Sequence, residues 1–207
     1  MSSIAIVDYG MGNVGSVRNA LSLLGAKARV TMQSDDFEAA SHIILPGVGA
    51  FADGMRELRE RGLIDILNRE VRDKNKPFLG ICLGMELLGS DGVEGGTTQG
   101  LDYIRGSVRR FLIDEDAFRL PHIGWNNITT RNAATLFRGI GTHDFYFVHS
   151  YILTPEDERD VSATCDYGVV FAAAVERENV FGTQFHPEKS QKAGLAVLRN
   201  FLNYHAQ

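Results

Sequence analysis

Cysteine is scarce in this sequence of 207 residues, which contains only Cys82 and Cys165. Two cysteines cannot build the disulfide framework on which small secreted proteins depend. The first residues, Met1-Ser2-Ser3-Ile4, lead directly into an apolar strand and lack the basic and apolar regions of a secretory signal. We therefore expect a soluble protein of the cytoplasm, a reducing compartment in which Cys82 stays a free thiol.

Long apolar runs and blocks of like charge are also missing. The longest apolar run, residues 169–175, is far shorter than the roughly 20 residues that cross a bilayer. The formal net charge is -5 and the isoelectric point is near 5.7, with lysine and arginine scattered along the chain. These features argue against nucleic acid and membranes as partners. The histidines show no metal-binding spacing, so neither a metal nor another cofactor is expected.

The first half of the sequence alternates strand patterns with helix patterns. Val14, Val17, Leu21 and Leu24 recur on one helical face, and Gly25 follows as a stop signal. Strands that are separated by helices pair in parallel and carry helices on both faces of the sheet. Strands are expected at residues 4–7, 28–30, 42–45 and 78–81, and helices at residues 14–24, 51–58, 64–67 and 195–202.

The second half is richer in strands. They are expected at residues 107–113, 145–149, 161–164, 169–175 and 180–185, while residues 91–100 read as a glycine-rich loop. The chain shows no internal repeat or linker, and its length fits one domain over residues 1–207. We therefore predict an α/β fold, with a mostly parallel central sheet, helices on both faces and a strand-rich second half.

The segment Gly80-Ile81-Cys82-Leu83-Gly84 is the strongest functional signal. It joins the apolar strand at residues 78–81 to the helical residues that follow Leu83. Such a strand-to-helix turn between glycines holds its central side chain in a tight, exposed position, as the serine elbow of α/β-hydrolases does. A structural cysteine needs no glycine two residues before and after it. Cys82 is therefore predicted to be a nucleophile, whereas Cys165 lacks such a turn and is predicted to be structural.

The segment Gln184-Phe185-His186-Pro187-Glu188 is the second signal. In an extended segment, His186 and Glu188 project from the same face, so the carboxylate can hold one imidazole nitrogen and leave the other for a thiol. Taken alone, the two residues could equally form a surface pair. Together with the elbow they indicate a nucleophile, a base and an orienting carboxylate.

Backbone N–H groups near Cys82 are expected to bind a developing oxyanion. Leu83 follows the nucleophile directly, and the loop Pro46-Gly47-Val48-Gly49 ends a strand at the same edge of the sheet. Its glycines permit a close approach to a ligand. The alternative is an ordinary tight turn after the third strand.

Two further features allow more than one reading. Residues 10–15 match the dinucleotide-binding pattern G-x-G-x-x-G, with Asp35 and Asp36 about twenty residues on. Such matches are frequent in glycine-rich α/β turns, and the polar bulk of Asp8-Tyr9 crowds this one, so we favour a turn that serves a partner surface. Trp125, the only tryptophan, could pack in the core or anchor an interface.

The sequence resembles the class I (triad) glutamine amidotransferases, and within them the glutaminase subunits of imidazole glycerol phosphate synthases. The elbow and the His-Pro-Glu segment indicate the superfamily. The segments Pro-His-x-Gly-Trp-Asn and Phe-His-Pro-Glu-Lys-Ser are similar to those of this subfamily. The matching segments run nearly end to end and comprise residues 8–13, 45–49, 80–88, 121–126, 146–151 and 184–190.

The resemblance implies a fold like that of the class I amidotransferases, which is flavodoxin-like, and a set of residue roles. Cys82 attacks the side-chain amide of glutamine, His186 protonates the departing ammonia, and Glu188 orients His186. Val48 and Gly49 belong to an oxyanion strand that rearranges before the hole forms, and Leu83 completes the hole. The positions that line the glutamine pocket are Gly47, Glu86, Glu94, Ser150 and Tyr151.

The resemblance also implies a partner. It is a (β/α)8-barrel cyclase that receives ammonia through an internal channel, forms a heterodimer with the glutaminase and makes imidazole glycerol phosphate and aminoimidazole carboxamide ribotide in histidine biosynthesis. The residues expected to face it are Asn13, Trp125, Tyr146 and Lys189. Free ammonia would be protonated and lost in water, so the glutaminase is expected to be idle without its acceptor.

One position departs from the family pattern, which has glutamine where this chain has Glu86. A carboxylate there could pair with the ammonium group of the substrate, but it would also raise the pKa of Cys82. Three alternatives remain open at this stage. The ammonia could serve a sugar-modifying amidotransferase, because relatives with nearly the same motifs do so. The chain could be a non-catalytic interaction subunit, or a cysteine peptidase of related fold.

Overall fold

The computed structural model describes residues 3–131 and 134–205, and its first half follows the expected alternation. The elements of this half are β1 (Ser3–Val7), α1 (Val14–Leu23), β2 (Lys27–Thr31), α2 (Ser34–Ala39), β3 (His42–Gly47), α3 (Phe51–Glu60), α4 (Leu63–Leu67), the π-helical turn η1 (Asn68–Asp73), β4 (Phe78–Cys82) and α5 (Leu83–Glu86). Helix α1 ends where Gly25 adopts a positive φ of 73°, as its stop signal predicts. No helix of the described residues is long and apolar enough to cross a membrane.

The second half is built mostly of strands. They are β5 (Asp91–Gly92), β6 (Thr98–Gln99), β7 (Gly106–Arg110), β8 (His122–Thr130), β9 (Asp144–His149), β10 (Tyr151–Pro155), β11 (Val161–Asp166), β12 (Val170–Arg177) and β13 (Val180–Thr183). Three short 3-10 turns, η2 (Thr135–Phe137), η3 (Glu158–Asp160) and η4 (Pro187–Lys189), and the closing helix α6 (Gln191–Leu202) complete the described elements.

Among the described residues, nine strands form the central sheet in the order β2-β1-β3-β4-β13-β12-β11-β8-β9. The pairs from β2 to β13 are parallel, and the pairs from β13 to β9 are antiparallel. The predicted α/β class is confirmed, but the sheet is mixed rather than mostly parallel. The reason is connection length: β11 to β12 and β12 to β13 are joined by turns too short for the crossover that a parallel pair needs. A second sheet has the order β10-β7-β5-β6.

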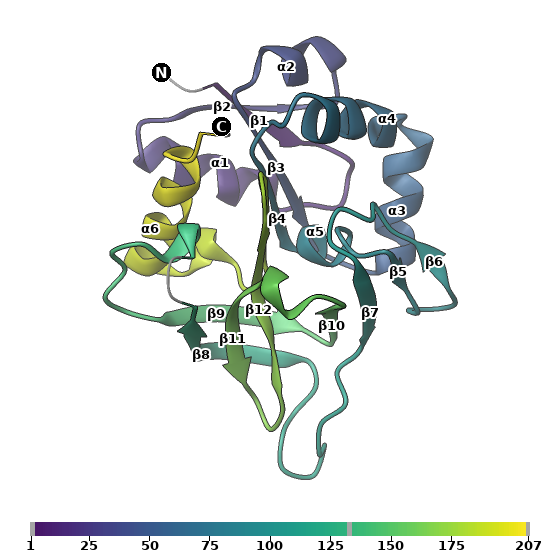
Figure 1. Cartoon of the computed structure of the whole chain (residues 1–207), viewed down its shortest axis with the longest axis vertical. Helices are drawn as coiled ribbons and strands as arrows, with labels where there is room; N and C mark the ends of the chain where they lie inside the picture. Colours follow the sequence, from purple (N-terminus) through teal and green to yellow (C-terminus); the bar gives the residue numbers. More distant parts are fainter. Residues whose placement is uncertain (1–2, 132–133, 206–207) are drawn as a thin grey trace.

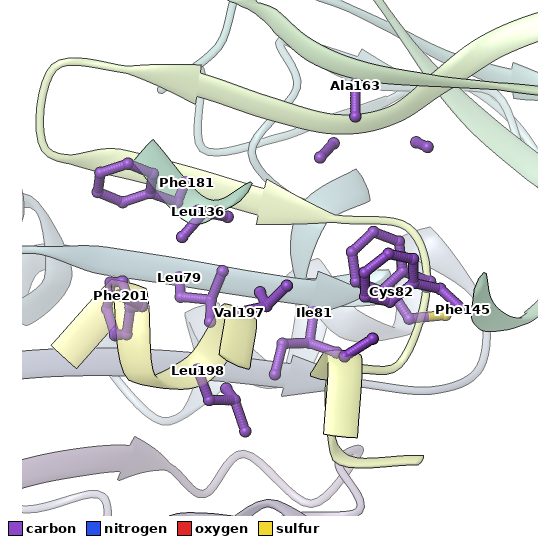
Figure 2. Close-up of a cluster of buried hydrophobic side chains, with 14 of the residues drawn as sticks. Leu79, Ile81, Cys82, Leu136, Phe145, Ala163, Phe181, Val197, Leu198 and Phe201 are labelled. Atoms are coloured by element: carbon purple, nitrogen blue, oxygen red, sulfur yellow. The ribbon is translucent and has the colours of Figure 1, made fainter. Parts of the chain in front are cut away.

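Helices cover both faces of the parallel half. Figure 1 shows α1 and α6 on one side of the sheet, and α3, α4 and α5 on the other. Alternate residues of β1 serve the two layers: Ile4 and Ile6 belong to the cluster under α1 and α6, while Ala5 and Val7 belong to the cluster under α3 and α4. Figure 2 shows the first cluster, in which β4 packs against α6 and the Cys82 side chain lies at one end. The nucleophile candidate is thus held by a rigid strand.

Some predicted boundaries were wrong and some elements were missed. Pro46 and Gly47 end β3 instead of opening a loop, and β7 stops at Arg110 rather than continuing to residue 113. Helix α2 and strand β8 were not predicted at all. The sequence of β8, HIGWNNITT, contains glycine and two asparagines that disfavour strands. Ladders to β9 and β11 on its two sides override that local preference.

Candidate active site

The turn at Cys82 explains the glycines around it. Cys82 ends β4 at a positive φ of 55°, a conformation that non-glycine residues rarely adopt, and α5 begins with the next residue. A Cβ atom on Gly80 would lie 2.4 Å from the carbonyl oxygen of Gly84. A Cβ on Gly84 would lie 1.8 Å from the carbonyl oxygen of Leu45. Both glycines are therefore required by close approach of backbone to backbone, which forms the elbow that the sequence predicts.

The predicted exposure of the Cys82 side chain was wrong, because the side chain is almost enclosed, with 6% of the residue exposed. Its Sγ donates to the carbonyl oxygen of Val148 at 3.7 Å. Burial raises the pKa of the thiol, and the nearby Glu86 carboxyl raises it further, while the Leu83 backbone N–H lowers it. In this arrangement Cys82 is a protonated thiol that needs a base before it can attack.

His186 and Glu188 form the expected pair. His186 Nδ1 lies 2.8 Å from Glu188 Oε1, and both side chains are buried. The predicted extended geometry was wrong, because β13 ends at Thr183 and Glu188 lies in the turn η4. The turn nevertheless brings the carboxylate to the imidazole. The His186 backbone N–H donates to the carbonyl oxygen of Tyr146, two residues before the Val148 carbonyl that accepts the Cys82 thiol, so this segment and the thiol meet along the same strand.

A cavity of about 320 Å³ opens at this edge of the sheet. It is lined by Val48, Gly49, Cys82, Leu83, Glu86, Glu94, Pro121, Val148, His149, Ser150 and Tyr151. All residues predicted for the oxyanion hole and the glutamine pocket line it except Gly47. Gly47 does not line the cavity, and a Cβ atom added to it would lie 2.4 Å from the Tyr9 hydroxyl oxygen. Sequence reasoning missed Pro121, Val148 and His149 as lining residues.

Two carboxyl groups face the cavity, and each is anchored. Glu86 is buried and accepts a hydrogen bond on Oε1 from Gln184 Nε2 at 2.9 Å. Burial raises the pKa of Glu86 to about 8, against a smaller lowering by Gln184 and with a further rise from the Glu94 carboxyl. Glu94 Oε2 accepts the backbone N–H of Phe51 at 2.9 Å, at the start of α3. The cavity therefore offers carboxyl oxygens to an ammonium group.

The loop after β3 is not yet an oxyanion hole. The Val48 N–H donates to the carbonyl oxygen of Met11 at 2.7 Å, so that N–H is occupied. Gly49 follows with a φ of 106°, which only glycine adopts without strain. Met11 belongs to the glycine turn at residues 10–15, in which a Cβ on Gly12 would lie 2.9 Å from the carbonyl oxygen of Pro46. The turn thus supports this loop.

The acidic residue that a dinucleotide would need is engaged elsewhere. Asp36 accepts hydrogen bonds from Arg29 Nη1 at 2.6 Å and from Thr31 Oγ1 at 2.7 Å. The glycine turn itself packs on the loop beside the cavity. Both observations argue against a dinucleotide site at residues 10–15 and favour a structural turn, while its service to a partner surface stays a prediction.

Three of the four residues predicted to face a partner gather together. Trp125 is 49% exposed, and its ring stands edge-on to Tyr146 at 6.1 Å between centroids. Lys189 Nζ lies 5.7 Å from the centre of the Tyr146 ring. Asn13 instead caps α1, accepting the backbone N–H of Ser16 at 3.3 Å. Cys165, predicted to be structural, is buried in β11.

The sequence was compared with family models and with curated proteins. The family model "Glutamine amidotransferase class-I" matches residues 5–204. "Imidazole glycerol phosphate synthase subunit HisH" of Moorella thermoacetica is 50% identical over 97% of this chain and 94% of its own length. The subunit HisH of Syntrophotalea carbinolica is 47% identical, over 96% of this chain and 98% of its own length. The subunit HisH 2 of Pseudomonas aeruginosa is 46% identical, with the same coverage of 96% and 98%.

Solved structures with the same fold were also found. A glutamine amidotransferase crystal structure superposes with a TM-score of 0.74 at 22% identity, covering 96% of both chains. A chain of the PurLQS complex of Thermotoga maritima gives 0.75 at 20% identity, covering 99% of both chains. At these identities the likeness concerns the fold alone.

Proposed function

The chain belongs to the class I glutamine amidotransferase family, and we propose that it is the glutaminase subunit of an imidazole glycerol phosphate synthase. In this role it hydrolyses glutamine to glutamate and passes the ammonia to a cyclase subunit in histidine biosynthesis. Identity of 46–50% to HisH subunits over nearly the whole chain supports the pathway. The observation that carries the chemistry is a buried thiol on a positive-φ turn, beside a histidine held by a carboxylate.

Cys82 is the nucleophile in this proposal, and His186 moves its proton. His186 Nε2 is buried and has no hydrogen-bond partner among the described residues, which leaves it for the thiol. As sulfur attacks the amide carbon of glutamine, the thiol proton passes to His186. The carbon–nitrogen bond then breaks, and that proton leaves with the nitrogen as ammonia. Water, losing a proton to His186, hydrolyses the thioester to glutamate and restores the thiol.

Glu188 fixes the imidazole in the orientation that this sequence of steps needs. Its Oε1 lies 2.8 Å from His186 Nδ1, so Nδ1 carries a proton and Nε2 stays the basic nitrogen. The buried carboxylate also stabilises the imidazolium that forms once the thiol is ionised.

The oxyanion of the tetrahedral intermediate is bound by backbone N–H groups of Leu83 and of the Val48–Gly49 loop. The Leu83 N–H already acts on the sulfur, whereas the Val48 N–H is bonded to Met11. Breaking the bond to Met11 and turning the loop would make the second donor available. A subunit in this resting state is expected to hydrolyse glutamine slowly.

Glutamine occupies the cavity with its side-chain amide at Cys82. The Glu94 carboxyl group attracts its ammonium group, Glu86 offers the hydrogen-bonding oxygens of a neutral carboxyl group, and the Ser150–Tyr151 segment forms another part of the wall. The cavity of about 320 Å³ is of the size that a small polar molecule needs.

The partner is a (β/α)8-barrel cyclase, which contacts the surface formed by Trp125, Tyr146 and Lys189. A half-exposed tryptophan packed on a tyrosine, with a lysine over the ring, is typical of an interface anchor. Asn13 lies at the start of α1, next to the loop that supplies the oxyanion donors. Contact with the cyclase is expected to free the Val48 N–H.

The direct test is glutamate release from glutamine, with and without the barrel cyclase of the same source and its ribonucleotide ligand. Strong stimulation by the loaded cyclase supports both the reaction and the pathway. Glutamate release that the cyclase does not change would keep the reaction and move the ammonia acceptor elsewhere, for example to a sugar amidotransferase. No glutamate release under any condition would contradict the proposed function.

Cys82→Ala is expected to lower glutamine hydrolysis by at least about 10³-fold, because Cys82 is the only thiol among the described residues that line the cavity. Cys165→Ala is the matched control, since it removes the only other cysteine of the sequence and leaves the cavity intact. Synthesis from added ammonia by the complex should survive both changes. Glutaminase activity retained in Cys82→Ala would contradict the assignment of the nucleophile.

A further inference from the structure

Two buried histidines lie directly behind one wall of the glutamine cavity. His122 begins β8 and His149 ends β9, where they face each other as partners in the antiparallel ladder. His122 Nδ1 lies 3.0 Å from His149 Nε2. Both residues are more than nine-tenths buried. Only His149 lines the cavity, so nothing in the proposed reaction uses His122.

The hydrogen bonds settle which nitrogen of each ring carries a proton. His149 Nδ1 lies 2.9 Å from the carbonyl oxygen of Tyr151, which can only accept. His149 therefore carries its proton on Nδ1 and offers a lone pair on Nε2. His122 must then donate from Nδ1. The result is a directed chain of two hydrogen bonds, from His122 through His149 to the backbone of Tyr151.

Their surroundings keep both rings neutral and fixed in place. The His122 ring stacks between Tyr167 and Phe147, with centroid distances of 3.9 and 4.9 Å. The His149 ring stacks on Phe111 at 5.6 Å. Burial lowers the pKa of His122 to about 4 and that of His149 to about 3. The hydrogen bond to the Tyr151 carbonyl opposes the lowering of the pKa at His149, while His122 and His186 add to it. Neither ring takes up a second proton near neutral pH, so the direction of the hydrogen-bond chain is preserved.

The chain of hydrogen bonds ends on residues that line the cavity. Tyr151, His149 and Ser150 line it, and the carbonyl oxygen of the preceding residue, Val148, accepts the Cys82 thiol. Pro121, the neighbour of His122, lines the same cavity. The two histidines therefore tie together two segments of the wall that are distant in the sequence.

We propose that His122 is a positioning residue for glutamine, which fixes the Ser150–Tyr151 wall of the pocket through its hydrogen bond to His149. The proposal deepens the proposed function and rests on it. If the donor on His122 is removed, the lone pair of His149 Nε2 is left buried without a partner. The His149 ring is then expected to shift so that this nitrogen finds another partner. Because His149 is hydrogen-bonded to the Tyr151 carbonyl, that carbonyl and the pocket wall would shift as well.

His122→Leu and His122→Asn form the matched test, because their side chains have the same shape. Asparagine keeps an N–H donor near the position of Nδ1, whereas leucine has none. In the glutaminase assay with the loaded cyclase, His122→Leu should raise the KM for glutamine about tenfold, the effect of one buried hydrogen bond left unmade. The kcat should change far less, since Cys82 and His186 are untouched. His122→Asn should restore KM to within about threefold of the original chain.

Nitrogen NMR of the histidine rings in the unaltered protein gives a readout independent of activity. His122 and His149 should both appear as neutral rings protonated on Nδ1 at pH 7. His149 protonated on Nε2 would overturn the proposal, even if His122→Leu failed to fold. Equal KM values for the leucine and asparagine variants would also overturn it. If the unaltered chain releases no glutamate, the proposed function fails, while the NMR result still decides whether the hydrogen-bond chain exists.

Discussion

Glu86 places a carboxyl group beside the nucleophile, at a position where a charge opposes the reaction. Its burial stabilises the neutral acid and raises the pKa to about 8, against a smaller lowering by the hydrogen bond from Gln184. A neutral Glu86 can donate a hydrogen bond into the cavity, much as a glutamine amide could. The ionised form would raise the pKa of Cys82 further. The substitution of glutamic acid for glutamine is therefore harmless below the pKa of Glu86 and costly above it.

Glu86→Gln should remove this dependence on pH. Near pH 6.5 the kcat/KM values of the two forms should agree within about threefold, because the native carboxyl is neutral there. Above pH 8 the native chain should lose activity relative to Glu86→Gln, by about tenfold at pH 9. Glu94, Cys82 and Tyr9 are present in both forms, so a difference between the two pH profiles reports the charge of Glu86 and its effect on the pKa of Cys82. Parallel pH profiles would show that Glu86 stays in one protonation state.

The same residue links stability to pH. The folded pKa of Glu86 is raised above its ordinary value, so folding binds a proton here. The stabilisation is present below the ordinary pKa of 4.5 and is lost as pH rises through about 8. Urea unfolding should therefore show the native chain losing free energy of unfolding relative to Glu86→Gln across this interval.

At the scale of elements, the elbow depends on the contact between α5 and β3. Gly84→Ala would place a Cβ 1.8 Å from the carbonyl oxygen of Leu45, so helix and strand would have to separate. We expect it to lower the free energy of unfolding by about 3 kcal/mol and to remove glutaminase activity. Gly15→Ala is the control within α1, where no heavy atom of the described residues lies within 4 Å of the added Cβ.

The control should not lose stability. Alanine is more favourable than glycine in a helix, but Gly15 lies in the first turn of α1, so Gly15→Ala should leave the free energy of unfolding unchanged or raise it by at most about 0.5–1 kcal/mol. Chemical unfolding of both variants measures the difference. A Gly84→Ala protein as stable as the original would show that the elbow tolerates a side chain at this position. The contact with Leu45 would then not be what requires glycine there.

The elements also show what the sequence can predict. Apolar runs and helical periodicity located β1, β3, β4 and α3, since each buries a continuous face. The elbow at Cys82 was predictable because the glycines that it requires lie within two residues of Cys82 in the sequence. Strand β8 was not, because its pairing with β9 and β11 outweighs its own polar residues.

The pairing of distant strands also hid part of the site. His149 reaches the cavity and His122 reaches His149 only through the register of β8 against β9, which no local pattern encodes. Glu188 was expected to join His186 through strand alternation, and it does so through the turn η4 instead. The residues were predictable from the motif, but the geometry that joins them was not.

At the scale of the whole molecule, the parallel half of the sheet holds Cys82, and the antiparallel half holds Trp125 and Tyr146, which we propose to face the partner. His186 lies where the two halves meet. Its backbone N–H donates to the carbonyl oxygen of Tyr146 at 2.9 Å, and its carbonyl oxygen accepts Ser190 Oγ at 2.6 Å. Ser190 Oγ in turn accepts the N–H of Tyr146 at 3.0 Å. A partner that binds at Tyr146 is therefore connected to the His186 backbone by hydrogen bonds, both directly and through Ser190.

Trp125→Ala tests this arrangement. An exposed tryptophan at the centre of an interface contributes about 2 kcal/mol or more to binding, which corresponds to about 30-fold in affinity. The cyclase concentration that gives half of the maximal stimulation of glutamate release should therefore rise about 30-fold. Leu23→Ala is the control, because Leu23 is 77% exposed but lies at the far end of α1 from the loop beside the cavity. Equal stimulation curves for the two variants would mean that the cyclase binds a different surface, and that its signal reaches His186 by a route other than Tyr146.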